Sequence, residues 1–345
     1  MIAPTSQRHH GLDAARGICA CAVAAYHFMA WSGLASPVSM SMFSVYAFFT
    51  LSSLTLCIVY GERFSRSIEA ISLERYALNR AARILPLLAL VSALTSLNTL
   101  LRGQPTGGDI ASFFFTASGI MGFGPAGMLA NATGAWSLGV EILFYFLFPC
   151  ACLLLLHQSI TVSVLVTLGA LTAQCAFLQT LLSDTSLVKQ WYLFVSPLSF
   201  AYYFCVGFLI YKTKKPVTGG LYIGLALLSA VILFSTTWHL TPETLLSFPL
   251  SIILPTIVGT AIWLIFNGDV ASPLTRGFEF LGAISYSIYL LHPLVYMVLD
   301  YAAHRTAAPF WLFAIIFGML VIVTGYASYR LVEIPARNWI RHLMP

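Results

Sequence analysis

Apolar stretches of membrane-spanning length recur along the whole chain, separated by short segments that carry turn residues and charges. A helix needs roughly 20 predominantly apolar residues to cross the hydrocarbon layer of a bilayer. The pattern therefore predicts an all-α fold, a polytopic transmembrane helical bundle of about ten spans that forms a single domain over residues 1–345. The predicted spans are Gly17–Gly33, Val38–Tyr60, Ile84–Leu101, Trp136–Leu156, Ile160–Leu182, Tyr192–Tyr211, Leu221–Trp238, Leu246–Phe266, Phe278–Leu299 and Phe310–Arg330.

The segment from Phe113 to Met128 is also apolar, but it is rich in residues that break helices. These residues are Gly119, Gly122, Gly124, Pro125 and Gly127. We interpret the segment as re-entrant or interfacial, because glycine and proline disfavour a continuous helix. The alternative, an eleventh crossing, would invert the orientation of every later span.

The positive charges bear on this choice. With the N-terminus inside, the cytoplasmic segments hold Arg8, Arg63, Arg66, Arg75, Arg80, Arg83, Lys212, Lys214, Lys215, Arg276, Arg330, Arg337 and Arg341. The outer loops hold Arg102, Lys189 and Arg305. Cytoplasmic loops of membrane proteins carry an excess of lysine and arginine. The asymmetry therefore predicts that both termini are cytoplasmic, and it argues against the extra crossing.

Composition supports a membrane protein. The chain is 59% hydrophobic and only 8% charged, with a mean hydropathy of +0.86, whereas soluble domains have roughly 25% charged residues. The net charge of +5 has this topological explanation and gives no indication of nucleic-acid binding. Neither Cys19 with Cys21 nor Cys150 with Cys152 puts both sulfurs on one helical face. We predict packing roles for the cysteines, and no metal site or disulfide.

The first span holds two residues that are costly to bury, Arg16 and His27. They lie on nearly the same helical face, about 16 Å apart along the axis, and His27 would sit near the middle of the bilayer. An ionisable residue at that depth indicates a functional site. Asp13, three residues before Arg16, can orient the arginine. Alternatively, Arg16 anchors the helix at the headgroups and His27 makes an interhelical hydrogen bond. A cleaved signal peptide is a further alternative, but cleavage would discard the pair.

Two more segments carry charged or polar side chains at helical spacing. Arg80 and Arg83 can project on one side of a helix at the membrane surface, where arginine pairs suit phosphate groups. Ordinary topological anchoring is the alternative. Ser137, Glu141 and Tyr145 form a polar stripe on an otherwise apolar helix. The buried carboxylate needs a partner, such as a histidine or arginine on a facing helix, and a purely structural ion pair is the alternative.

A third polar face lies near the C-terminus, where Ser285, Tyr289, His292 and Tyr296 recur at helical spacing. Pro293 would kink the helix and free a carbonyl group beside the histidine. Aromatic residues near span ends commonly form an interface belt, but His292 lies too deep for that role. Glu333, in the stretch that follows the last span, is a weaker candidate.

In their order along the chain, these segments resemble the motifs of the acyltransferase-3 family of integral-membrane acyltransferases. The matching segments are Leu12-Asp13-x-x-Arg16-Gly17 with His27, Arg80-x-x-Arg83-Ile84-Leu85-Pro86, Trp136-Ser137-Leu138-x-x-Glu141-x-x-x-Tyr145, Ser285-Tyr286-Ser287-x-Tyr289-Leu290-x-His292 and Glu333-Ile334-Pro335. Phe48-Phe49-x-x-Ser52-Ser53 resembles another family stretch, but Ser53 stands where glycine is usual. This departure questions a close backbone approach and leaves the chemistry intact. The chain resembles a stand-alone member without an SGNH domain.

The resemblance implies a membrane O-acyltransferase of the bacterial inner membrane. It would move an acyl group, expected to be acetyl, from cytoplasmic acyl-CoA to a hydroxyl of a cell-surface or lipid-linked carbohydrate. The expected partners are acyl-CoA as co-substrate, the glycan acceptor and membrane lipid, with no bound cofactor and no metal. His27, Arg16, Glu141 and Asp13 are the expected catalytic residues, with His27 as general base. Arg80, Arg83 and Arg16 would bind acyl-CoA. Trp136, Ser137, Tyr145, Tyr286, Tyr289, His292 and Glu333 would line the cavity.

Two other classes of protein compete with this interpretation. A proton-coupled transporter or flippase would use His27, Glu141 and His292 as a proton relay. The Arg80–Arg83 pair separates the two hypotheses, because an acyl-CoA enzyme needs it and a proton relay does not. A structural membrane scaffold would leave the buried charges unexplained.

Overall fold

The computed structural model describes residues 9–103, 107–184, 186–238, 240–268, 275–303 and 309–342. These residues form helices and no strand, with one isolated bridge between Val217 and Gly268, so the all-α prediction is confirmed. Arg8 and Arg305, which entered the charge pattern, lie outside the described residues. The helices are α1 His10–Trp31, α2 Val38–Arg66, α3 Ala70–Leu101, α4 Gly107–Ser118, η1 Ile120–Phe123, α5 Ala126–Leu129, α6 Ala135–Leu155, α7 Ile160–Leu182, α8 Leu187–Phe194, η2 Pro197–Ser199, α9 Ala201–Lys212, α10 Gly220–Ile232, α11 Phe234–Trp238, α12 Pro242–Leu246, α13 Leu250–Asn267, α14 Thr275–Ala303, α15 Phe310–Ser328, η4 Tyr329–Glu333 and α16 Ile334–His342.

Within the described part of the chain, 7 helices are long and apolar enough to cross a membrane. They are α2, α3, α6, α7, α13, α14 and the continuous run Phe310–Ile340 that begins with α15. Each contains most or all of one predicted span, although α3 begins at Ala70, well before the predicted start at Ile84. The count of ten and the cytoplasmic position of both termini stay predictions.

The predicted span Tyr192–Tyr211 is divided in the structure. α8 ends at Phe194, the short helix η2 follows, and α9 starts at Ala201. The side chain of Ser196 accepts a hydrogen bond from the Leu198 amide and begins η2 with Pro197 at its first position, so a new helix starts inside the apolar run. The predicted span Leu221–Trp238 is similarly divided into α10 and α11. Hydropathy depends only on how apolar the residues are, so it gives no sign of a cap such as that of Ser196.

The glycine-rich segment between α3 and α6 forms three short helices, α4, η1 and α5. Gly119 separates the first two with a φ of +75°, a conformation that glycine adopts without steric cost. Pro125 precedes α5. None of the three helices is long enough to cross a bilayer, as expected for a re-entrant or interfacial segment.

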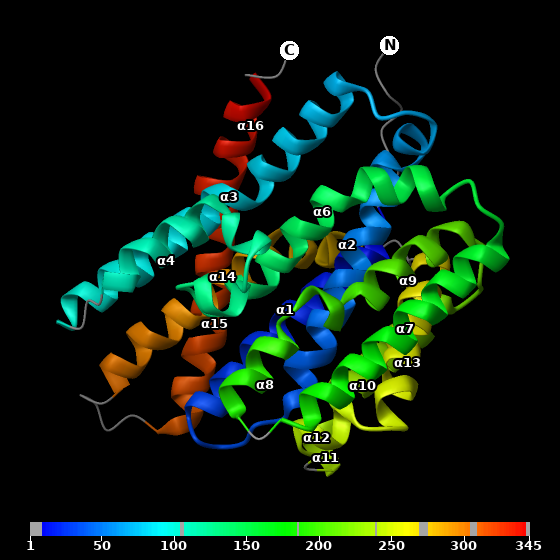
Figure 1. Cartoon of the computed structure of the whole chain (residues 1–345). Helices are drawn as coiled ribbons and strands as arrows, with labels where there is room; N and C mark the ends of the chain where they lie inside the picture. The colour runs from blue at the N-terminus through cyan, green and yellow to red at the C-terminus, as the bar shows by residue number, and fades with distance from the viewer. Residues whose placement is uncertain are drawn as a thin grey trace. The chain divides into compact units, whose positions relative to one another are not determined.

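The described residues fall into two compact units, each built from separate stretches of chain. Unit 1 takes its residues from Met1–Ala22, Pro37–Ile68 and Phe146–Ala283, and unit 2 from Val23–Ser36, Glu69–Tyr145 and Ile284–Pro345. In unit 1, α2 packs against α9, α10 and α13, and α10 lies along α13 (Figure 1). In unit 2, α3 packs against α4 and α16. The single domain over residues 1–345 stays a prediction.

A close contact between α2 and α9 in unit 1 involves the position where the chain departs from the family. Ser53 is fully buried, and its hydroxyl donates a hydrogen bond of 2.7 Å to the carbonyl of Phe204. It faces Gly207, where an added Cβ would lie 1.7 Å from Ser53 Oγ and 2.7 Å from the carbonyl oxygen of Thr50. The close approach of the two helices is therefore retained, with the glycine on α9.

Asn131 ties the loop before α6 to α3 and α4 in unit 2. Its side chain donates to the Ser96 hydroxyl at 2.9 Å and accepts from the Ser92 hydroxyl at 2.8 Å. Its backbone amide donates to Thr116 Oγ1 at 2.9 Å. Both ends of the amide side chain are thus used inside the protein. Asn131 therefore has a structural role in unit 2.

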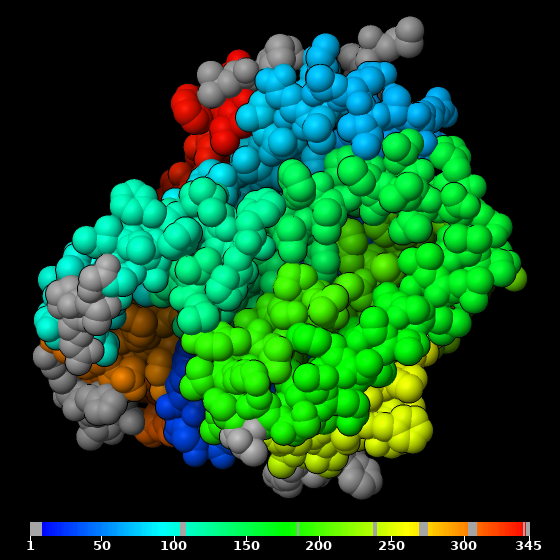
Figure 2. Space-filling view, in the orientation of Figure 1, coloured from blue at the N-terminus to red at the C-terminus, as the bar shows by residue number. Residues whose placement is uncertain are grey.

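Apolar side chains cover the outward faces of the long helices. On α7, Leu165 and Leu168 are 62% and 52% exposed, and the green surface in Figure 2 includes this helix. On α15, Val323 is 60% exposed. Exposed leucine and valine along whole helices are expected where lipid replaces water as the solvent.

Candidate active site

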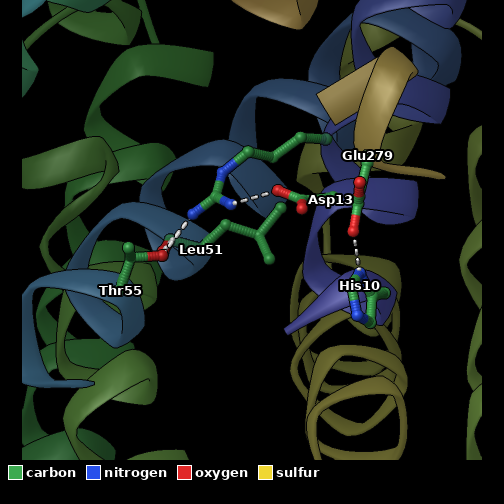
Figure 3. A network of polar contacts seen from close by, with 6 residues as sticks. His10, Asp13, Leu51, Thr55 and Glu279 are labelled. Carbon is green, nitrogen blue, oxygen red and sulfur yellow. Dashed lines mark hydrogen bonds and ion pairs between the residues drawn. The ribbon is translucent and has the colours of Figure 1, made fainter. Parts of the chain in front are cut away.

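Arg16 lies in unit 1 and is held by both α1 and α2. Its guanidinium is 3.5 Å from Asp13 Oδ1 and 3.5 Å from the carbonyl oxygen of Leu51. It also donates a hydrogen bond to the hydroxyl of Thr55, which itself donates to the Leu51 carbonyl at 2.6 Å. Asp13, Leu51 and Thr55 converge from the two helices in Figure 3. The expected pairing of Asp13 with Arg16 is present, whereas Thr55 had no signal in the sequence because its contact joins distant segments.

Glycines bring α14 close to this part of α1. A Cβ at Gly17 would lie 2.6 Å from Leu281 Cβ, and one at Gly282 would lie 2.5 Å from Asp13 Cβ. One turn before Asp13, His10 Nδ1 is 3.1 Å from Glu279 Oε1 (Figure 3). The glycine of the Arg16-Gly17 motif therefore serves helix packing, and Asp13 is buried on one side by α14.

His27, at the other end of the motif, lies in unit 2 against His292 of α14. His27 Nδ1 is 3.0 Å from His292 Nε2 and 3.1 Å from the carbonyl oxygen of Val23. His292 Nδ1 is 3.1 Å from the carbonyl oxygen of Ile288. His292 has no exposed surface, whereas His27 is half-buried. The two histidines that the sequence singled out separately thus form one hydrogen-bonded pair.

Aromatic rings surround this pair. The Trp31 indole stacks on His27 with ring centroids 4.7 Å apart, and Tyr296 lies against Trp31 at 5.1 Å. Trp31 remains 39% exposed. Sequence reasoning did not select Trp31, although its position one turn after His27 could have indicated the contact.

Tyr289 and Ser137 join α14 to α6 within unit 2. Their hydroxyls are 2.8 Å apart, and Tyr289 also donates to the carbonyl of Gly134 at 3.2 Å. Ser137 donates to the same carbonyl at 2.9 Å. Trp136, the residue before Ser137, is half-buried. The Trp136–Ser137 motif therefore fixes the start of α6 against α14.

Further along α6, Tyr145 donates a hydrogen bond to Glu141 on the same helix. The Arg80 guanidinium lies over the Tyr145 ring, 5.8 Å from its centroid, a distance at which cations and aromatic rings attract. Tyr76, one turn before Arg80 on α3, donates to the Tyr145 carbonyl at 2.8 Å. Glu141 thus accepts a hydrogen bond from within its own polar stripe, and Arg80 and Arg83 of α3 act electrostatically on Tyr145.

The C-terminal motif around Glu333 makes further polar contacts in unit 2. Ser287 donates a hydrogen bond to Glu333, which also interacts electrostatically with Arg83. Tyr286 donates to the carbonyl of Ile84 at 2.7 Å. Glu333 ends η4, a π-helical turn. Such turns form where an α-helical hydrogen bond is lost, and Pro335 two residues later cannot donate one.

The structure therefore brings most of the predicted site residues into one unit. His27, Arg80, Arg83, Trp136, Ser137, Glu141, Tyr145, Tyr286, Tyr289, His292 and Glu333 belong to unit 2, and Asp13 and Arg16 belong to unit 1. Among the described residues there is no group of three or more histidine, cysteine or acidic side chains that could hold a metal ion. The polar groups available for chemistry are imidazole, guanidinium, carboxylate and hydroxyl.

A family model for an acyltransferase domain, that of the acyltransferase-3 family, matches residues 9–330. The match covers nearly the whole chain, and the protein belongs to this family. Together with its long apolar helices, this makes it a multi-pass membrane protein and an acyltransferase in general terms. Searches of curated proteins and of solved structures found no match.

Proposed function

We propose that the protein is an O-acyltransferase of the bacterial inner membrane that moves an acyl group, expected to be acetyl, from cytoplasmic acyl-CoA to a carbohydrate hydroxyl. The carbohydrate is a cell-surface or lipid-linked glycan. The observation that carries the proposal is the half-buried His27, whose ring is hydrogen-bonded to the buried His292, in a chain of an acyltransferase family.

The proposed reaction needs one base. His27 takes the proton from the attacking hydroxyl, whose oxygen forms a bond to the thioester carbonyl carbon. The carbon–sulfur bond then breaks, and the thiolate of CoA receives the proton from His27. The products are the acylated sugar and free CoA. Arg16, oriented by Asp13, polarises the thioester or holds a phosphate, and Glu141 orients the base or the acceptor.

Arg80 and Arg83 are proposed to bind the phosphates of acyl-CoA. Both are half-exposed near the start of the apolar part of α3. Arg83 interacts electrostatically with Glu333, and the Arg80 guanidinium lies over the ring of Tyr145. These protein contacts hold the guanidinium groups in place before a ligand arrives. Preorganised arginine groups bind phosphate with less entropic cost.

The function is tested by comparing the acylation of cell-envelope glycans in native cells with the gene, without it, and with it restored. Mass spectrometry of the released glycans should reveal an ester that disappears with the gene and returns on complementation. Purified protein with labelled acetyl-CoA and the identified glycan should then form the same ester. Unchanged glycan acylation combined with altered proton-coupled uptake would favour the transporter hypothesis instead.

Replacing either arginine of the pair by alanine should weaken acyl-CoA binding more than it affects folding. Each charge-assisted phosphate contact contributes roughly 1.5–3 kcal/mol, so the dissociation constant should rise about tenfold or more for Arg80→Ala and for Arg83→Ala. Isothermal calorimetry with CoA measures the affinity. Arg75→Ala is the matched control, because Arg75 is an exposed arginine of the same helix.

A second variant separates binding from structure at Arg83. Removing Arg83 leaves Glu333 with only one of its two favourable positive charges, that of Arg337, and Arg83→Ala/Glu333→Gln removes the resulting imbalance. If the double variant recovers CoA affinity as well as stability, Arg83 is a structural ion-pair residue. Equal CoA affinities in wild type, Arg80→Ala and Arg83→Ala would show that the two arginines only anchor the helix at the cytoplasmic face.

A further inference from the structure

The two imidazole rings of unit 2 make three short contacts that constrain where their hydrogens lie. A neutral imidazole has one N–H and one nitrogen with a lone pair. A carbonyl oxygen only accepts hydrogen bonds, so a ring nitrogen that bonds to it must carry the hydrogen. His27 Nδ1 faces the carbonyl of Val23, and His292 Nδ1 faces the carbonyl of Ile288, each at 3.1 Å.

One arrangement satisfies all three contacts. If His292 carries its hydrogen on Nδ1, its Nε2 has a lone pair and accepts the hydrogen of His27 Nδ1 across 3.0 Å. His27 Nδ1 then donates to His292 and to the Val23 carbonyl together. The opposite arrangement, with the hydrogen on His292 Nε2, would place lone pairs of both Nδ1 atoms against carbonyl oxygens. That arrangement loses two hydrogen bonds and adds repulsion.

Pro293 strengthens this assignment. Proline has no amide hydrogen, so it cannot bond to the carbonyl of Tyr289 four residues earlier. That carbonyl acts electrostatically on the His292 imidazole, whose Nδ1 bonds to the carbonyl of Ile288. The negative potential of these carbonyl oxygens favours a hydrogen on Nδ1.

From this geometry we infer that His292 is a positioning residue, which together with the Val23 carbonyl holds His27 in the tautomer with hydrogen on Nδ1 and leaves the lone pair on Nε2. The inference rests on the proposed role of His27 and adds which of its nitrogens is the base. In the reaction, the proton of the attacking hydroxyl goes to His27 Nε2. The imidazolium that forms keeps its Nδ1–H bond to His292, which has the place that a carboxylate takes in a serine-hydrolase triad.

Nitrogen NMR of the full-length protein in lipid bilayers tests the assignment without any substrate. With 15N-labelled histidine, protonated and unprotonated ring nitrogens have widely separated shifts, and signals are assigned by their loss in His27→Ala and His292→Gln. We expect both rings to carry hydrogen on Nδ1, with a scalar coupling between His27 Nδ1 and His292 Nε2. A hydrogen on His292 Nε2, or on His27 Nε2, overturns the inference.

Two substitutions of His292 test its effect on turnover. His292→Phe keeps an aromatic ring but removes the acceptor, so we expect kcat to fall tenfold or more with an unchanged KM for acyl-CoA. Only the Val23 carbonyl then holds the hydrogen on Nδ1, so a larger share of His27 should carry it on Nε2, the form that the histidine side chain prefers in water. His292→Gln offers an amide oxygen as acceptor. It should keep the wild-type tautomer of His27 and most of the turnover that His292→Phe loses.

The outcomes separate this inference from the proposed function. If His27→Ala remains active, the general-base role fails whatever the tautomer is. If His27→Ala is inactive while His292→Phe retains full kcat and the wild-type tautomer, the general-base role of His27 is supported and the positioning role of His292 is wrong. If His292→Phe does not fold, the tautomer of the wild-type protein and the behaviour of His292→Gln still decide the question.

Discussion

His27→Ala should abolish acyl transfer while leaving a protein that inserts into the membrane. A positioned general base contributes roughly 10²–10⁴-fold to a rate, and alanine supplies no substitute. The variant leaves the buried Nε2 of His292 without its donor, so we expect a stability loss of about 1–3 kcal/mol. Initial rates with labelled acetyl-CoA, with membrane yield and thermal unfolding measured in parallel, test this.

The matched control is His157→Ala. His157 is an exposed histidine between α6 and α7, so its loss should leave the rate and the stability unchanged. A His27→Ala protein that accumulates normally and keeps more than about a tenth of the wild-type rate would rule out the general-base role.

Gly122→Ala should destabilise unit 2. The added Cβ would lie 2.1 Å from the carbonyl oxygen of Gly139 and 2.9 Å from its carbonyl carbon. Both are backbone atoms of α6, so no side chain can turn aside to make room. Overpacking of this kind costs about 1–3 kcal/mol and sometimes more. Because Gly139 lies between Ser137 and Glu141, activity should fall as well.

A graded series of glycine substitutions provides the controls. A Cβ at Gly139 would approach Met121 Cγ and Ala126 Cβ at 3.1 Å, so Gly139→Ala should cost less than Gly122→Ala. Gly318 on α15 has no atom within 4 Å of the added Cβ, and Gly318→Ala should be neutral or stabilising, because alanine favours helix. Thermal unfolding in detergent measures all three. Equal melting temperatures for Gly122→Ala and Gly318→Ala would contradict the contact.

Local features of the site could be read from the sequence. The pairing of Asp13 with Arg16 and that of Glu141 with Tyr145 join residues three or four apart, so helical periodicity alone predicts them. The contact between His27 and His292 joins residues 265 positions apart. Both histidines were selected as costly residues within apolar helices, but no periodic pattern specifies that one ring faces the other.

The long continuous helices could be predicted from the sequence, but the interruption of an apolar run could not always be. Apolar length identifies α2, α3, α6, α7, α13, α14 and α15, because a long helix needs only a continuous apolar run. The division of Tyr192–Tyr211 was missed, because a serine cap and a proline interrupt the helix without changing its hydropathy. The broken segment before α6 was anticipated because its glycines and proline are visible directly.

The contact between Ser53 and Gly207 constrains sequence evolution at these two positions. The two positions share the volume of one side chain between α2 and α9. A mutation that enlarges residue 207 therefore requires a smaller residue 53 first, so the order of the two events matters. A Cβ at residue 207 would also lie 2.7 Å from the carbonyl oxygen of Thr50 and 2.8 Å from the amide nitrogen of Leu54, so α2 and α9 must move apart as well. Glycine at position 207 should therefore vary little, even in related chains that have glycine at position 53.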